Sequence, residues 1–316
     1  MQSKSSVLEA IGNTPLVSLS LPAAGSVYAK CEFLNPSGSH KDRLYHYAIQ
    51  KLESEGSLRR GMTLIDFSSG NAGTALALCA GLNGYKCVLV RPDGMSAMKL
   101  HHMRALGAQV ELTPREEGVP GARLRAFELA GAYGGNAYLM LQTESCHNIE
   151  AFEIMGKEIT RDCAAAGVLP THFVCGVGTG GCFTGVMNYL RSVFPDISGV
   201  AVEIEGQHIL YSSIHNITIA RRPHRVEGLS TGELYANTRT DMIDEVLVIS
   251  EDEAWSTAEM LARTATAFVG PSSGANVAAA ISIARSSHEA TTVITVLFDA
   301  GWKYALEWPG PKEMKK

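Results

Sequence analysis

One lysine of this 316-residue chain stands where a helix is expected to begin. Lys41 follows residues 35–40, Asn-Pro-Ser-Gly-Ser-His, which include several turn formers. A helix N-terminus favours anions, so a cation at this point either lies in solvent or serves a group nearby. A lysine that forms a Schiff base needs a lowered pKa, which a dry cleft or a cationic neighbour can supply. The position of Lys41 alone leaves both interpretations open.

A short loop follows the apolar segment 63–67. Its residues 68–73 read Ser-Ser-Gly-Asn-Ala-Gly and precede a segment with helical periodicity. If 63–67 is a strand of an open α/β sheet, this loop lies at the carboxyl end of the strand, where ligands collect. Its backbone N–H groups and serine hydroxyls could hold a carboxylate. A plain glycine-rich turn is the alternative for this loop taken alone.

A second glycine-rich segment covers residues 175–185, Cys-Gly-Val-Gly-Thr-Gly-Gly-Cys-Phe-Thr-Gly, again between a predicted strand and a predicted helix. Glycine lets the backbone approach an oxyanion closely, and a helix start adds its dipole, so the segment is typical of a phosphate cradle. The spacing is not the GxGxxG of dinucleotide folds, and no Lys-Ser/Thr pair of a nucleotide P-loop follows. We therefore expect a phosphate other than that of a dinucleotide or ATP.

A third segment, residues 270–275, reads Gly-Pro-Ser-Ser-Gly-Ala and is expected to precede a helix over 275–284. A hydroxyl such as that of Ser272 can hydrogen-bond a heteroatom without adding charge, which would leave a pyridine nitrogen unprotonated. A serine that caps the helix explains the same residues equally well.

Short apolar runs alternate with longer segments of helical periodicity, which predicts βαβ units and an α/β fold with parallel sheets. Strands are expected over 63–67, 86–90, 109–112, 172–175, 199–205, 244–249 and 292–298. Helices are expected over 72–82, 96–106, 148–166, 185–193 and 251–264. The chain exceeds the usual size of one hydrophobic core, so two lobes with a cleft between them are expected.

The composition excludes several classes of function. A formal net charge of −5 offers no basic surface of the kind that binds nucleic acid. No apolar run is long enough to cross a membrane, and the N-terminus lacks the apolar core of a signal peptide, so we expect a cytoplasmic protein. The seven cysteines include no CxxC pair, which favours reduced thiols, and we expect no metal site.

Taken together, these segments resemble the cysteine synthase and cystathionine β-synthase family of fold-type II pyridoxal phosphate enzymes. The likeness runs from residues 11–16, Ile-Gly-Asn-Thr-Pro-Leu, to residues 298–304, Phe-Asp-Ala-Gly-Trp-Lys-Tyr. It implies a homodimer of two-lobed α/β subunits, similar to the tryptophan synthase β-subunit, with the cofactor in the cleft. The smaller, mobile lobe would be 35–147 and bind the substrate carboxylate. The larger lobe would comprise 1–34 and 148–316 and bind the cofactor phosphate.

The resemblance also implies a role for individual residues. Lys41 would carry the cofactor as a Schiff base and move the α-proton of the substrate. Asn71 would hydrogen-bond the 3′ oxygen of the cofactor, and Ser272 its pyridine nitrogen. The phosphate would lie against Gly178, Thr179, Gly180, Gly181 and Cys182. The substrate carboxylate would lie against Ser68, Ser69, Asn71, Ala72 and Gln142.

The reaction implied is β-replacement on O-acetylserine, O-phosphoserine or serine. It would pass through an aminoacrylate intermediate that a small nucleophile attacks, giving cysteine or a related β-substituted alanine. One alternative is β-elimination by a dehydratase or desulfhydrase that releases a keto acid and ammonia. Another is a cofactor-binding protein without catalytic activity.

Several positions depart from the family pattern, and they lie where the substrates are expected. They are His40, Ala72, Cys182 and the segment 227–234, which replaces a glycine-rich stretch. Within or beside that segment we expect contacts to the second substrate, from Gly228, Ser230, Thr231 and Glu233. The arginines 221, 222 and 225 could bind an acidic substrate, and a solvated charged loop is the alternative.

Overall fold

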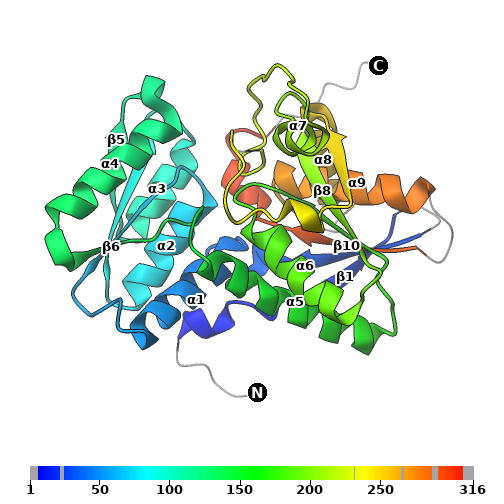
Figure 1. The fold of residues 1–316 in the computed structure, drawn as a ribbon, viewed down its shortest axis with the longest axis horizontal. Helices are drawn as coiled ribbons and strands as arrows, with labels where there is room; N and C mark the ends of the chain where they lie inside the picture. Colours follow the sequence, from blue (N-terminus) through cyan, green and yellow to red (C-terminus); the bar gives the residue numbers. More distant parts are fainter. Residues whose placement is uncertain (1–5, 22–24, 231, 265–266, 287–290, 309–316) are drawn as a thin grey trace.

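The computed structural model describes residues 6–21, 25–230, 232–264, 267–286 and 291–308. Its strands form two sheets, one of six strands in the order β1-β2-β10-β7-β8-β9 and one of four in the order β5-β4-β3-β6. Figure 1 shows the two sheets in separate halves of the molecule, with α1 and α5 along the lower side where the halves meet.

The elements have the following bounds. The larger sheet contains β1 (Leu16–Leu19), β2 (Ser26–Cys31), β7 (His172–Gly176), β8 (Ser198–Ile204), β9 (Glu245–Ile249) and β10 (Thr292–Leu297). The smaller sheet contains β3 (Thr63–Phe67), β4 (Lys86–Pro92), β5 (Gln109–Thr113) and β6 (Ala137–Leu139). The helices are α1 (Lys41–Ser54), α2 (Asn71–Leu82), α3 (Ala97–Ala105), α4 (Gly118–Ala132), α5 (His147–Ala166), α6 (Gly181–Val193), α7 (Ile209–His215), α8 (Glu251–Arg263) and α9 (Pro271–Ser286). The short 3₁₀ turns are η1 (Val7–Ala10), η2 (Glu32–Leu34), η3 (Arg115–Glu117), η4 (Gly134–Asn136), η5 (Thr240–Met242) and η6 (Gly301–Tyr304).

Parallel pairing dominates both sheets. Each pair of neighbouring strands is parallel except β1 and β2, which pair antiparallel. All five residues of β3 are buried between helices on both faces of the sheet, which explains its mostly apolar sequence. The buried Asp66 accepts a hydrogen bond from Tyr45 OH at 2.7 Å. The predicted α/β fold with mostly parallel sheets is confirmed.

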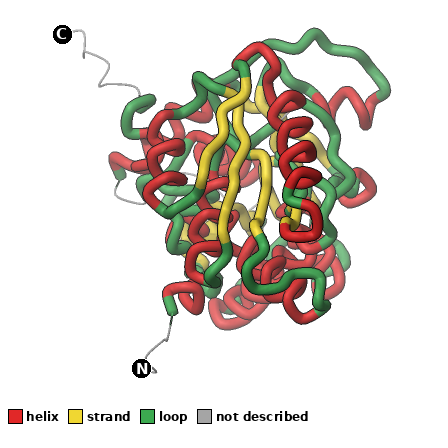
Figure 2. The backbone as a smooth tube through the Cα atoms, turned by 90° about the vertical axis from the view of Figure 1, so that its left-hand side faces the viewer, coloured by secondary structure: helices red, strands yellow, loops and turns green. Residues whose placement is uncertain are grey.

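Helices cover both faces of the smaller sheet. Figure 2 shows this half of the molecule toward the viewer, with helices on either side of the strands. On one face α4 encloses a separate apolar cluster of Ile65, Phe67, Val88, Val90, Ala122 and Ala126. The opposite face joins the main core, to which Leu64, Leu89 and residues of α1 and α2 contribute. The four strands of this sheet fall within 63–139, inside the range predicted for the smaller lobe. The lobe boundaries and the mobility of that lobe stay predictions.

The sequence patterns missed five helices and strands, and two predicted helices begin earlier than expected. The missed elements are β1, β2, β6, α4 and α7; β1 and β6 are only four and three residues long, too short to show a period. The helix predicted over 185–193 begins at Gly181, and the helix predicted over 275–284 begins at Pro271. Proline is well suited to the first helical position because its missing N–H has no partner there in any case. Ser272 therefore lies in the first turn of α9 rather than in a loop before it.

Two further observations concern the helices and the cysteines. Among the described residues, none of the helices is both long and apolar enough to span a bilayer. The seven cysteines are all free thiols, and Cys146 alone among them is exposed.

Candidate active site

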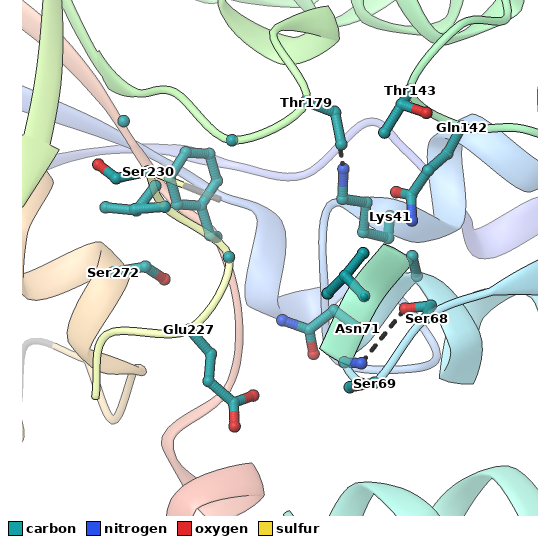
Figure 3. Close-up of a pocket in the computed structure, with 18 of the residues that line it drawn as sticks. Lys41, Ser68, Ser69, Asn71, Gln142, Thr143, Thr179, Glu227, Ser230 and Ser272 are labelled. Carbon is teal, nitrogen blue, oxygen red and sulfur yellow. Dashed lines mark hydrogen bonds between the residues drawn. The ribbon is translucent and has the colours of Figure 1, made fainter. Parts of the chain in front are cut away.

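A cavity of about 350 Å³ lies between the two sheets. Its walls come from the loop between β3 and α2, from the loop between β7 and α6, from the start of α1 and from the segment 224–230. Each of these two loops follows the carboxyl end of a parallel strand, β3 in the smaller sheet and β7 in the larger one, and ligands collect at such strand ends. Figure 3 shows Lys41 pointing into this space toward Thr179, with Asn71, Ser68 and Ser69 on one side and Ser272 and Ser230 on the other.

Lys41 is the first residue of α1, as predicted. The backbone N–H of the preceding His40 donates to Phe298 O at 2.9 Å, which ties the helix start to the end of β10. Lys41 Nζ donates to Thr179 Oγ1 at 3.4 Å. Burial lowers the pKa of Lys41 to about 8, although the nearby Cys182 and Asp66 act in the opposite direction. A substantial fraction of neutral, nucleophilic amine is therefore present near neutral pH.

His40 forms an apolar wall beside this lysine. Its ring packs against Phe298 at 4.6 Å and Phe152 at 5.6 Å between ring centroids. Burial, followed by the charge of Lys41, holds the pKa of His40 well below its usual range. The imidazole is thus neutral and adds no second cation next to Lys41.

The loop between β7 and α6 has the geometry of an anion site. Gly180 is the N-cap of α6 and adopts φ +83°, a conformation that favours glycine. A Cβ on Gly180 would lie 2.2 Å from Thr238 Oγ1, and one on Gly181 would lie 2.3 Å from Asn148 Cγ. Because a glycine N-cap has no side chain, the first N–H groups of this 13-residue helix remain available to an anion.

The predicted phosphate residues lie at this loop. Gly178, Thr179, Gly180 and Cys182 line the cavity, and Gly181 opens the helix. The Thr179 hydroxyl is held by Asn148 Nδ2 at 3.1 Å. The Cys182 thiol faces the buried Cys175, with the two sulfur atoms 4.0 Å apart, so Cys182 has its backbone N–H to offer.

The loop between β3 and α2 is held by one of its own side chains. Ser68 Oγ accepts from the N–H of Gly70 at 3.2 Å and of Gly73 at 3.1 Å. Ser68 therefore shapes the loop, while Ser69, Asn71 and Ala72 also line the cavity. Gln142 lines the cavity as well, and its buried Oε1 has no hydrogen-bond partner among the described residues. A carboxylate would need donors from these groups, namely backbone N–H groups, the Ser69 hydroxyl and the Nε2 end of the Gln142 amide.

Ser272 reaches the cavity from the first turn of α9, which corrects the expectation of a loop. It is 4% exposed. The neighbouring Ser273 uses its hydroxyl differently, since Ser273 Oγ accepts from the N–H of Phe298 at 2.8 Å. Two adjacent serines that look alike in the sequence thus have different roles.

The residues predicted for a second substrate are only partly brought together. Gly228 and Ser230 line the cavity, whereas Thr231 lies outside the described residues. Ser230 has φ +50°, and its Oγ accepts from Ile204 N at 3.1 Å, so the hydroxyl fixes the backbone of the segment. Glu233 is exposed and is not part of the cavity wall.

The three arginines near this segment do not reach the cavity. Arg225 is paired with the carboxylate of Glu251, and Arg221 donates to the backbone oxygen of Gly232. A charged surface loop accounts for both contacts.

Charged groups that the sequence patterns missed lie beside Asn71. Lys99 and Glu227 both line the cavity and form an ion pair, with Lys99 1% exposed. Asn71 is held on both ends of its amide by Lys303 and Asp299. Lys303 and Asp299 belong to the segment 298–304, which the family resemblance already includes. That resemblance was the only signal in the sequence for these two residues.

A cluster of possible metal ligands lies apart from the cavity wall, although the sequence predicts no metal site. Ligand-type atoms of Cys146, His147 and Glu150 lie within 4.8 Å of one another at the start of α5. His147 Nδ1 lies 3.2 Å from Glu150 Oε2, an ordinary ion-pair distance. No spacing rule had pointed to these three residues.

The residues around the cavity fit pyridoxal phosphate. An amine with a lowered pKa, an anion-binding helix start, an amide fixed as a donor and an uncharged hydroxyl converge on a space of suitable size. Each corresponds to one functional group of that cofactor: the aldehyde, the phosphate, the ring oxygen and the ring nitrogen.

Comparisons with known proteins agree with this geometry. The family model described as "Pyridoxal-phosphate dependent enzyme" matches residues 7–299. A probable cysteine synthase of Bacillus subtilis is 37% identical over 298 residues, covering 93% of this chain and 94% of that protein. Cysteine synthase A of Escherichia coli K12 is 35% identical, covering 93% of this chain and 91% of that protein.

Two solved structures are also similar. The crystal structure of O-ureido-L-serine synthase superposes with a TM-score of 0.90 at 35% identity, covering 96% of this chain and 94% of that one. The O-acetylserine-dependent cystathionine β-synthase of Helicobacter pylori gives a TM-score of 0.88 at 34% identity, covering 99% of this chain and 100% of that one.

Proposed function

The chain belongs to the family of pyridoxal-phosphate dependent enzymes, and from this premise we propose that it catalyses β-replacement on a serine-derived amino acid. The observation that carries the proposal is the placement of Lys41. Its amine, with a pKa lowered to about 8, lies between an anion-binding helix start and a loop suited to a carboxylate. That is the arrangement needed to hold the cofactor on one side and an amino acid on the other.

The residues that would hold the cofactor are Lys41 through its amine, Asn71 through its amide, and Ser272 through its hydroxyl. Its phosphate would lie at the start of α6, against Gly178, Thr179, Gly180, Gly181 and Cys182. Bound there, the cofactor supplies an electron sink that makes the Cα–H bond of an amino acid acidic. Because the Ser272 hydroxyl is uncharged, it would leave the pyridine nitrogen unprotonated and the cofactor a weaker electron acceptor. This favours loss of a β-substituent over a long-lived carbanion.

The protein side of the reaction would be carried by a few groups. Ser69, Ala72 and Gln142 would bind the substrate carboxylate and orient the Cα–H bond toward Lys41. The Lys41 amine would take up this proton as the β-substituent leaves, and would return it after the nucleophile has added. Neutral His40 and its apolar neighbours would exclude water from the reacting carbon.

The first substrate is proposed to be O-acetylserine, O-phosphoserine or serine, and the product cysteine or another β-substituted alanine. The similarity to cysteine synthases and to the O-acetylserine-dependent enzyme supports this choice. We further propose that the smaller lobe, residues 35–147, closes on the substrate carboxylate. A cytoplasmic homodimer is the proposed state of the protein.

A substrate panel tests the proposal. Purified protein loaded with pyridoxal phosphate is mixed with serine, O-acetylserine or O-phosphoserine, with and without sulfide, and both the amino-acid product and keto acid are quantified. We expect a β-substituted alanine only when the nucleophile is present. Keto acid at full rate without a nucleophile would instead establish β-elimination. The variant Lys41→Ala should lose the visible absorbance of attached cofactor, whereas Lys157→Met, at an exposed site on α5, should keep it.

A further inference from the structure

The segment 298–304, red in Figure 1, contacts three parts of the site at once. Phe298 O accepts from the N–H of His40 at 2.9 Å, next to Lys41. Asp299 O accepts from the N–H of Gly270 at 3.0 Å, just before the helix of Ser272. The Asp299 side chain reaches Asn71. The segment thus connects the three elements that carry the proposed cofactor contacts.

The amide of Asn71 is held at both ends. Lys303 Nζ donates to Asn71 Oδ1 at 2.8 Å, and Asn71 Nδ2 donates to Asp299 Oδ2 at 2.6 Å. An amide has one oxygen and two N–H groups. With Oδ1 directed at Lys303 and one N–H directed at Asp299, the second N–H of Nδ2 is left as the donor that Asn71 can offer to the cavity.

The two partners of Asn71 are themselves fixed. Tyr304 OH donates to Asp299 Oδ2 at 2.6 Å, and Lys303 Nζ also lies 3.3 Å from Thr74 Oγ1. Asp299 is fully buried and Lys303 is 1% exposed. Since water does not compete at such depth, these contacts are stronger than their equivalents at the surface.

A buried lysine at this place is costly. Burial lowers the pKa of Lys303 to about 8, even though Asp299 and Asp42 act in the opposite direction. An apolar side chain of similar length would fill the space without that cost. The charged and titratable groups that act on or are acted on by Lys303 are Asp299, Asp42, Lys99, His40 and His102.

The charge of Lys303 matters for any anion next to Asn71. Asp299 is a carboxylate in direct contact with Asn71, and by itself it would repel a negative oxygen placed on the remaining N–H. Lys303, bonded to the other end of the same amide, offsets this repulsion and polarises the amide so that its N–H becomes a better donor.

We propose that Lys303 is a positioning residue, which presents Asn71 to the cavity as a hydrogen-bond donor and balances Asp299, so that the site selects the ionised form of the cofactor's ring oxygen. This rests on the proposed function, because it requires pyridoxal phosphate in the cavity with its 3-oxygen at Asn71. It assigns a role to Lys303 through Asn71 and not through contact with the reacting atoms.

The test compares cofactor binding and absorbance in apoprotein reconstituted with pyridoxal phosphate. In Lys303→Met we expect about tenfold weaker binding, the usual effect of losing one charge-assisted hydrogen bond. The absorbance should shift toward the band of the protonated ring oxygen. Lys303→Arg keeps the positive charge, so its loss of affinity and its shift of absorbance should both be smaller than those of Lys303→Met. Lys157→Met should match the unmodified protein.

An analogue of the cofactor without its 3-hydroxyl group separates positioning from a general structural role. With this analogue the difference in affinity between the unmodified protein and Lys303→Met should disappear, because no ring oxygen meets Asn71. An equal loss of affinity with the analogue, or an unchanged spectrum in Lys303→Met, would overturn the proposal.

Two controls keep these outcomes distinct. If circular dichroism shows that Lys303→Met does not fold, Lys303→Gln retains a neutral donor for Asn71 and should still shift the absorbance. An unshifted spectrum in Lys303→Gln would then overturn the role of the charge. If the unmodified protein does not bind pyridoxal phosphate at all, the proposed function itself fails.

Discussion

The starts of α2 and α6 face the same cavity and have the same local plan, yet they are surrounded differently. Each follows a buried parallel strand, and each has glycine as its N-cap, Gly70 and Gly180. At α6 the side chains in contact, Asn148 and Thr179, are uncharged, and the cation that reaches Thr179 is Lys41 of the site itself. Around α2 lie two pairs of opposite charges, Lys99 with Glu227 and Lys303 with Asp299.

Under the proposed function, the two helix starts would bind their ligands in different ways. At α6 the backbone would supply the donors, so a change of side chain there should have little effect as long as the glycines remain. At α2 side chains from distant segments contact Asn71, so substrate specificity should depend on them. Variants at the two helix starts, and pH acting on the lysine between them, test this contrast.

Lys41, between the two helices, provides the largest expected effect. With a pKa of about 8, its neutral, reactive form grows as pH rises toward that value and levels off above it. The rate at which apoprotein attaches pyridoxal phosphate should increase about 100-fold from pH 6 to pH 9. Stopped-flow absorbance measures this rate. A rate that is flat over this range would mean that Lys41 is not the attachment site. A rise of about 1000-fold that does not level off by pH 9 would mean that its pKa is not lowered.

Gly180→Ala should weaken anion binding at the start of α6. Its Cβ would come within 2.2 Å of Thr238 Oγ1 at φ +83°, so the loop must move away from the anion position. We expect pyridoxal phosphate to bind about 30-fold weaker, in line with strain of 1–3 kcal/mol at such a site. Gly61→Ala is the matched control, since Gly61 has φ +91° but nothing within 4 Å. Equal cofactor affinity in the two variants would contradict the close-approach explanation.

Lys99→Met should instead weaken binding of the amino-acid substrate at the start of α2. It removes a buried cation from the cavity wall and leaves the Glu227 carboxylate without its partner, which repels an anionic substrate. We expect KM for the amino-acid substrate to rise about tenfold while cofactor affinity changes little. Steady-state kinetics and cofactor titration measure the two quantities. Restoration of KM in the double variant Lys99→Met/Glu227→Gln would show that the unpaired carboxylate causes the loss.

Cys182→Ser should have the smallest effect. The Cys182 thiol faces Cys175, and the proposed phosphate contact is the backbone N–H, which serine retains. Cofactor affinity should change less than about threefold, below the usual value of one hydrogen bond. Equilibrium titration with pyridoxal phosphate decides the matter, and a larger loss would mean that the thiol itself contributes to binding.

The sequence patterns were accurate where local information suffices. The strand expected over 63–67 is β3 with the same bounds, and the helix start at Lys41 is observed. Both depend on periodicity, turn residues and burial within a few residues of each other. The start of α9 was misplaced because Pro271 can begin a helix as readily as it can end a loop.

The hydrogen-bond partners of side chains were harder to predict than the helices and strands of the backbone. Ser68, Ser230 and Ser273 are three serines at the site whose hydroxyls bond to backbone N–H groups of the protein itself. The sequence identifies Ser68 and Ser230 as possible substrate ligands and does not separate Ser273 from its neighbour Ser272, because a serine in a glycine-rich loop offers the same atoms in either case. Which acceptor or donor each one meets depends on residues that only folding brings near.

The sequence alone determined most of the order of strands, loops and helices, without β1, β2, β6, α4 and α7, and with it the glycine-rich helix starts and the lysine between them. These follow from the chain's local conformational preferences. The tertiary structure alone decided that Lys303 and Asp299 lie on the amide of Asn71, from 232 and 228 positions further along the chain. Such pairings are decided by the desolvation and charge balance of a packed interior, and these quantities do not exist until the two halves of the chain have come together.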